Sequence, residues 1–188
     1  MYDGADTLVL YEELAFQGVL PVAWHAVSTP LDREATAGFD ERNIRLLQAW
    51  DAMEEHVSLE KPEDAPHSAE IQRLDLKVNL LLDLVGQLLS ANRPRPAPTP
   101  IRFNALGASF RLTGQLPPAG EQGITEIYLR DCLAEPLRLP GRVTNVSPDG
   151  QIKVRFLPLG ETVSELIEKL AFRRHRRQVA GTRQPRRP

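Results

Sequence analysis

The residues whose types and spacing come nearest to a ligand site lie in the stretch 98–112, PTPIRFNALGASFRL. Two strand-like runs flank a short turn that carries Arg102, Asn104 and Gly107. A guanidinium binds phosphate oxygens, an amide can read a base edge, and a glycine lets a ligand approach the backbone closely. The chemistry that such a turn could offer is therefore ligand binding, with no bond broken, and the turn is a binding site, a degenerate binding site or only a turn.

A plain strand turn is the favoured interpretation of the same residues. In that interpretation Gly107 supplies a positive φ angle, and Phe103, Leu106 and Phe110 pack into the interior. The turn would then have a backbone role alone.

The sequence lacks the residue patterns that catalysis and metal binding require. The sequence has no glycine-rich phosphate loop, and its single cysteine, Cys132, cannot form a thiolate metal site. The carboxylate pairs Glu12–Glu13 and Glu54–Glu55 are adjacent in sequence, so they point apart on a helix. We therefore expect no enzyme, no catalytic residue, no cofactor and no metal. The four histidines do not have the spacing of a helical zinc pair: His25, His56, His67 and His175.

The C-terminal sixteen residues contain seven arginines and no acid, so the other 172 residues carry a charge of −9 within a net charge of −2. Clustered arginine could contact nucleic acid or anionic lipid with salt-dependent affinity. The favoured alternative is a solubilising disordered tail over 179–188, with 172–178 continuing a last helix. Because the body is acidic, we do not expect nucleic acid as a partner. The basic cluster comprises Arg173, Arg174, Arg176 and Arg177.

The elements that must position these residues begin with a segment, 1–38, whose GVLPVAWHAV suits a strand. Pro21 indicates a sheet edge or a bulge. A turn-like stretch follows, and a helix is predicted from about Asp40, which we expect to be its N-cap. Pro62 and Pro66 should end that helix. Its apolar residues recur at helical spacing: Ile44, Leu47, Trp50, Met53 and Val57.

A second helix should open at Ser68, and its apolar residues form a heptad seam with β-branched side chains at a and leucine at d. Such a seam favours a parallel dimer, but leucines at c, e and g widen the face. We therefore predict that 39–90 is an oligomerisation insertion that forms a homo-tetramer first and a dimer second. The alternative is that this helix packs on its own barrel. The seam comprises Ile71, Leu74, Val78, Leu81, Val85 and Leu88.

Residues 91–100 hold four prolines and predict a semi-rigid linker. Short strand-like runs separated by Pro, Gly and Asp fill much of 101–178, and SPDG around Pro148 and Gly150 predicts a tight turn. Residues 161–178 read as a closing helix. The sequence therefore predicts an α+β protein with a small antiparallel barrel, long helices forming a hairpin or coiled coil, and a C-terminal helix.

This order of parts resembles the PilZ domain, a six-stranded β-barrel that typically senses cyclic di-GMP in bacteria. The resemblance covers about 18–28 and 100–175, with 39–90 as an insertion between the first two strands. The family's motifs are RxxxR before the first strand and [D/N]xSxxG at a later turn. In the second motif only Gly107 matches, since Arg102 replaces the acid and Asn104 the serine. The arginine positions of the first motif fall near Glu13 and Gln17.

The resemblance therefore implies an atypical, degenerate PilZ protein. Hydrogen bonds to charged groups contribute about 1.5–3 kcal/mol each, so two lost arginine clamps weaken binding by roughly 10²–10⁴-fold. We expect no binding of cyclic di-GMP through the usual site, and the alternative is a receptor that uses a non-standard site. The family acts in type IV pilus assembly, motility and virulence signalling, which implies an unidentified protein partner for this chain.

Location is predicted from what the sequence lacks. A single cysteine excludes an internal disulfide, and the start of the chain has no secretory pattern. The apolar segment 78–89 is too short to span a bilayer and contains Asp83. We expect a cytoplasmic protein without a membrane span.

Overall fold

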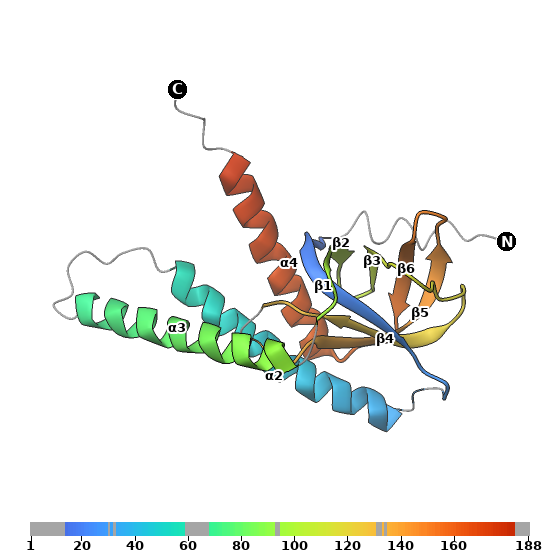
Figure 1. Ribbon diagram of the computed structural model, residues 1–188, viewed down its shortest axis with the longest axis horizontal. Coiled ribbons are helices and arrows are strands. Elements are labelled where there is room, and N and C mark those ends of the chain that lie inside the picture. The colour runs from blue at the N-terminus through green and yellow to red at the C-terminus, as the bar shows by residue number, and fades with distance from the viewer. Residues whose placement is uncertain are drawn as a thin grey trace.

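Six antiparallel strands close a barrel in the order β1-β2-β3-β6-β5-β4 in the computed structural model (Figure 1). The structure describes residues 14–29, 31, 33–58, 68–92, 95–130, 133 and 135–182. Helices α2 and α3 lie between β1 and β2 in the chain, and α4 follows β6. The predicted six-stranded α+β barrel is therefore confirmed. The elements are β1 (Phe16–Ala26), α2 (Arg33–Ser58), α3 (Ser68–Asn92), β2 (Pro98–Phe103), β3 (Gly107–Arg111), β4 (Gln122–Ile127), β5 (Leu137–Val146), β6 (Gln151–Phe156) and α4 (Glu161–Thr182).

Strand β1 joins the two ends of the sheet. Its first half, from Phe16 to Pro21, pairs with β2, and its second half, from Val22 to Ala26, pairs with β4. Pro21 stands where the partner changes, and its carbonyl accepts a hydrogen bond from the Tyr128 N–H at 3.1 Å. The proline thus marks a change of partner within a closed barrel, whereas the sequence indicated a sheet edge or a bulge.

Alternating residues of the strands fill the barrel interior. Strand β6 shows the pattern clearly, because Ile152, Val154 and Phe156 are buried while the residues between them face outward. Helices α2 and α4 pack against each other and extend this core outside the barrel. The largest fully buried side chains are Phe103, Phe110, Leu47, Ile127, Leu137, Leu139, Ile152, Ile167, Leu170, Val143, Val154 and Val163.

Strand β2 begins at Pro98, inside the stretch 91–100 that the sequence indicated as a linker. The N–H of Asn104 points toward β3, where it donates to the Gly107 carbonyl at 3.0 Å. Because N–H groups alternate along a strand, positions 98 and 100 face the same side. Strand β3 pairs only with residues 101–103, so prolines at 98 and 100 forfeit no ladder hydrogen bond.

Helix α2 begins at Arg33, seven residues before the predicted start, and Asp40 is not its N-cap. The Asp40 carboxylate instead accepts a hydrogen bond from the Gly160 N–H at 2.9 Å. Gly160 immediately precedes α4, so Asp40 supplies an acceptor and negative charge at the N-terminus of that helix. A residue placed on one helix by sequence position thus caps another.

Helix α4 ends at Thr182, so residues 179–182 are helical and do not belong to a disordered tail. The remaining residues of that predicted tail, 183–188, lie outside the described residues. The predicted apolar face of α4 is confirmed, with Val163, Ile167 and Leu170 fully buried and Leu166 packed against the core.

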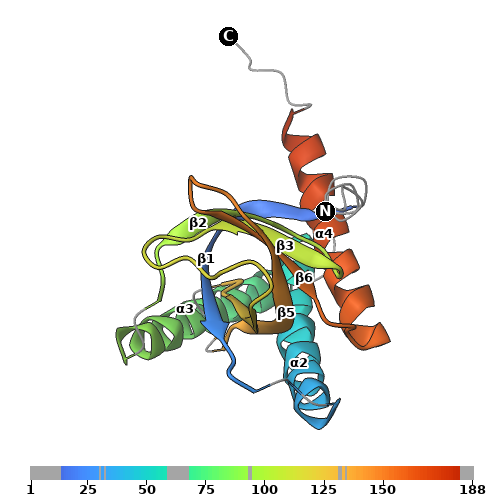
Figure 2. The same ribbon diagram turned by 90° about the vertical axis from the view of Figure 1, so that its right-hand side faces the viewer.

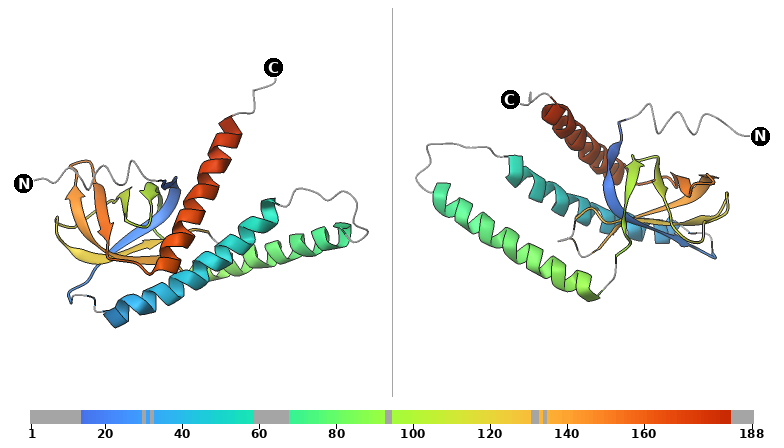
Figure 3. Two further views of the ribbon diagram at one scale, coloured as in Figure 1. Left: turned by 180° about the vertical axis from the view of Figure 1, so that it is seen from behind. Right: turned by 45° about the horizontal axis from the view of Figure 1, so that its top comes forward.

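Helices α2 and α3 run away from the barrel as an open, roughly antiparallel pair (Figure 3). Helix α2 packs on β5 and α4 along part of its length, and α4 packs on β1. Among the α3 side chains that the structure describes, none belongs to the hydrophobic core cluster, so the rest of the chain leaves these side chains largely uncovered.

Candidate functional site

The β2–β3 turn is closed by Asn104, whose side chain is buried at 2% exposure. Its Oδ1 accepts hydrogen bonds from the backbone N–H groups of Leu106 at 2.9 Å and Gly107 at 3.1 Å. An asparagine that bonds its own backbone two and three residues on is a typical turn former. The oxygen that could have read a ligand is committed to the turn.

Gly107 is required here because two strands approach closely. A Cβ at this position would collide with the backbone carbonyl oxygen of Val154 on β6. The expected positive φ angle is wrong for this residue, since the described glycines with positive φ are Gly114, Gly120 and Gly150. The last of these confirms the predicted SPDG turn. Sequence patterns do not show how near a neighbouring strand lies, so this reason for Gly107 could not be foreseen.

The outer side of the turn brings together two positions that the sequence considered separately. Arg102 lies opposite Gln17 of β1 on one side and opposite Ser109 of β3 on the other. One position from each of the two PilZ motifs therefore lies here, on neighbouring strands. Gln17 stands where the first motif has an arginine, and Arg102 stands where the second motif has an acid. Leu106 is 44% exposed, so the prediction that it packs inside is wrong. Glu13 lies outside the described residues.

The six seam residues of α3 are all exposed, between 46% and 68% of each side chain being open to solvent. The alternative in which this helix packs its seam on its own barrel is therefore wrong for this chain. Leu76 was not predicted to belong to this surface, and it extends Leu80 and Leu84 into a second exposed apolar row at i, i+4 and i+8. Both rows are open on one helix.

Three of the four arginines in the basic cluster bind the protein itself. Arg173 contacts Asp51 of α2 at 2.7 Å, and Arg177 forms an ion pair with the buried Glu54. The Arg174 guanidinium lies 5.6 Å from the Phe16 ring centre and donates to the Gln17 carbonyl at 3.3 Å. These contacts hold α4 against α2 and β1. The continuation of the last helix over 172–178 is confirmed.

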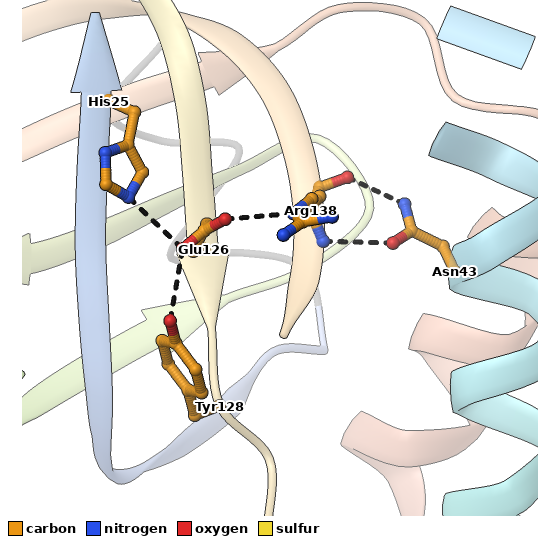
Figure 4. Close-up of polar contacts among 5 residues, drawn as sticks. All are labelled: His25, Asn43, Glu126, Tyr128 and Arg138. Carbon is orange, nitrogen blue, oxygen red and sulfur yellow. Dashed lines mark hydrogen bonds and ion pairs between the residues drawn. The ribbon is translucent and has the colours of Figure 1, made fainter. Parts of the chain in front are cut away.

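A polar network on the outside of the barrel was not predicted (Figure 4). Glu126 of β4 accepts hydrogen bonds from Arg138 at 2.9 Å and from the Tyr128 hydroxyl at 3.2 Å, and His25 of β1 lies 3.2 Å away. Burial alone would raise the pKa of the Glu126 carboxyl, but Arg138, His25 and Tyr128 together hold that pKa below its ordinary value. Burial, followed by the Glu126 charge, raises the pKa of Tyr128. The network ties three strands together.

Taken together, a closed six-stranded antiparallel barrel with appended helices defines a PilZ-type protein. The family model "Atypical PilZ domain, cyclic di-GMP receptor" matches residues 47–184. The chain therefore belongs to the atypical PilZ family, which confirms the resemblance seen in the sequence.

A solved structure resembles the whole chain. It is described as a pathogenic protein from Xanthomonas campestris that reveals a new tetrameric PilZ domain self-assembled via an unusual helical bundle. The two chains share 28% identity and a TM-score of 0.71, over 94% of this chain and 96% of that one. Comparison with curated proteins gives no match. Within the residues that the structure describes, no helix has both the length and the apolar character needed to cross a membrane.

Proposed function

We propose that this protein is a non-enzymatic, cytoplasmic PilZ scaffold that self-associates through α3 and acts by protein–protein contacts. The observation that carries this proposal is the exposure of the complete heptad seam, from Ile71 to Leu88. A contiguous apolar stripe open to water on a folded domain marks an interaction surface.

Energetics favour burial of the seam between copies. Fully burying one Leu, Ile or Val side chain contributes about 1.5–3 kcal/mol. Since roughly half of each seam side chain is exposed, six of them offer each protomer about 5–9 kcal/mol before the entropic cost of association. A parallel tetramer is the first choice, because the leucines outside a and d make a face wider than a dimer can cover. The Xanthomonas campestris relative, described as tetrameric through a helical bundle, supports this choice.

The cellular processes in which the scaffold would act are inferred from the family. PilZ proteins act in type IV pilus assembly, motility and virulence signalling, and the relative is described as a pathogenic protein. Several barrels held on one helical bundle would bind an unidentified partner protein at several sites at once. Such multivalent binding raises the overall affinity even when each single contact is weak. In this proposal the usual cyclic di-GMP site has been lost, because Asn104 is committed to its turn and Gln17 stands where an arginine is needed.

A cyclic di-GMP receptor that uses a different site is the second candidate. The family's description names such a receptor. A pocket of about 310 Å³ lies between β1, α2 and α4, and its lining residues include Arg130, Arg174, Arg177 and Trp50. Arginine and an aromatic ring could hold a phosphate and a guanine. The buried Glu54 carboxylate in the same pocket already pairs with two of these arginines, which counts against the candidate.

The mass of the wild-type chain in solution tests the proposal. Static light scattering over a range of concentrations should give four times the monomer mass of 21.0 kDa. Twice that mass would select the dimer, and 21.0 kDa at all concentrations would reject the scaffold.

A further inference from the structure

The pocket between β1, α2 and α4 has an unbalanced charge. Its lining residues include three arginines, Arg130 from the loop after β4 and Arg174 and Arg177 from α4. The acid among the lining residues is Glu54 of α2. Three positive charges and one negative charge give the lining a net charge of +2, whereas the chain as a whole carries −2.

Contacts within the protein hold each of these guanidinium groups in place. The Arg130 Nη2 donates to Glu54 Oε1 at 2.7 Å, and the Arg177 Nη1 forms an ion pair with Glu54 Oε2. The Arg174 Nε donates to the Gln17 carbonyl at 3.3 Å. A guanidinium has five N–H donors, and these contacts engage one nitrogen of each. Side chains that are already held lose little further freedom when a ligand binds, so the pocket is preorganised.

The lining residues differ in their exposure to solvent. Phe16, Trp50 and Leu129 are between 7% and 8% exposed and form an apolar floor. The side chains of Arg130 and Arg177 are 36% and 42% exposed, so they reach the rim. A ligand therefore meets charged groups beside a floor of low polarity, where charge interactions are screened less than in water.

We infer that this pocket binds a single oxyanion, a carboxylate or a phosphate group. Arginine binds both groups with paired, charge-assisted hydrogen bonds. One such anion offsets much or all of the +2 charge of the lining. The volume of about 310 Å³ is at the lower end of the range for ligand pockets, which suits one anionic group better than a cyclic dinucleotide. The pairing of Glu54 with two arginines leaves the charge that one oxyanion requires.

The oxyanion has two sources. One is a free ion, and the other is an acidic or phosphorylated side chain of the partner protein. This second source rests on the proposed function. The pocket lies within one protomer, so binding of an oxyanion does not require assembly through α3. A chain that stays monomeric and a pocket that stays empty are therefore separate results.

Fluorine NMR of the full-length chain labelled with 5-fluorotryptophan tests the inference. The chain has two tryptophans, of which Trp50 lines the pocket, while Trp24 donates a hydrogen bond to Glu121 at 2.8 Å. Titration with inorganic phosphate at constant ionic strength should shift the Trp50 signal saturably and leave the Trp24 signal unchanged. A phosphoserine peptide and a glutamate peptide, both blocked at their ends, report the second source. Tighter binding of either peptide than of phosphate would assign the pocket to a protein side chain.

Two arginines of α4 provide the matched variants. Arg174→Gln should weaken phosphate binding about tenfold or more, because a charge-assisted hydrogen bond is lost. Arg176→Gln should leave the affinity unchanged, since Arg176 lies over the Phe172 ring and does not line the pocket. If Arg174→Gln moves the Trp24 signal before phosphate is added, Val19→Glu replaces it. Val19 is an exposed lining residue, so a negative charge there should also weaken binding.

Three results would overturn the inference. The first is a Trp50 signal that none of the three anions shifts saturably. The second is an equal loss of affinity in Arg174→Gln and Arg176→Gln. The third is a shift of the Trp50 signal by cyclic di-GMP at lower concentration than by phosphate, which would assign the pocket to the nucleotide.

Discussion

Asn43 of α2 makes with Arg138 of β5 the two hydrogen bonds that a neighbouring strand would make. Its Nδ2 donates to the Arg138 carbonyl at 2.7 Å, and its Oδ1 accepts from the Arg138 N–H at 2.9 Å (Figure 4). Strand β6 pairs with β5 only from Gly141 onward, so this part of β5 has an edge that no strand covers. A helix side chain completes the ladder, and α2 is thereby fixed to the barrel.

Replacing Asn43 with alanine should lower the free energy of unfolding by about 2–3 kcal/mol. The change leaves the backbone N–H and carbonyl of Arg138 without these partners. Asn43 itself is only 1% exposed, so the two groups lie in a buried place. Urea denaturation measures the loss. The matched control Gln48→Ala, on the exposed side of the same helix, should change stability by less than about 0.5 kcal/mol, and an equal loss in both variants would contradict this role for Asn43.

A methyl group added at Gly107 should destabilise the barrel by about 1–3 kcal/mol, because it would meet the Val154 carbonyl of β6. Gly38 provides the control, since it lies in α2 with open space around it. Gly38→Ala should stabilise the protein by up to about 1 kcal/mol. Opposite signs in thermal or urea unfolding are the expected result, and two neutral substitutions would refute the close approach of the strands.

The Glu126 network should make stability depend on pH in the acidic range. Because the pKa of Glu126 is lower in the folded protein, its contribution is fully present above the unfolded pKa, about 4.3, and is lost as the pH falls through the folded pKa. Glu126→Gln should therefore cost about 1.5–3 kcal/mol at neutral pH and progressively less below about pH 4. A difference between the two chains that stayed constant from pH 7 to pH 3 would contradict this assignment.

Calorimetric titration with cyclic di-GMP should show no binding in the low-micromolar range. Two lost arginine clamps correspond to about 3–6 kcal/mol, or roughly 10²–10⁴-fold in affinity. Low-micromolar binding would instead favour the pocket beside Trp50. In that case Arg174→Ala should abolish it, while Arg102→Ala should leave it unchanged.

The parts of the fold that repeat regularly were predictable from the sequence. Period-two and heptad patterns depend on neighbours in the chain, so β1, the start of α3 at Ser68 and the buried face of α4 follow from them. The heptad spacing also identified the six seam residues of α3, which the structure leaves exposed.

What could not be predicted depends on neighbours in space. Asp40 caps α4 across 120 residues of sequence, Gly107 is needed because β6 lies against it, and Asn43 bonds a strand 95 residues away. No local pattern encodes such distances. The arginines of α4 were misread for the same reason, since their partners Asp51 and Glu54 lie on another helix.

The mass of seam variants tests the central claim most directly. Val78→Asp and Leu81→Asp place a charge at a and d of the seam, while Gln48→Asp makes a similar change at an exposed polar position of α2. Light scattering should give a multiple of 21.0 kDa for the wild type and for Gln48→Asp, and 21.0 kDa for the two seam variants. A monomeric wild type, or seam variants that keep the wild-type mass, would contradict assembly through α3.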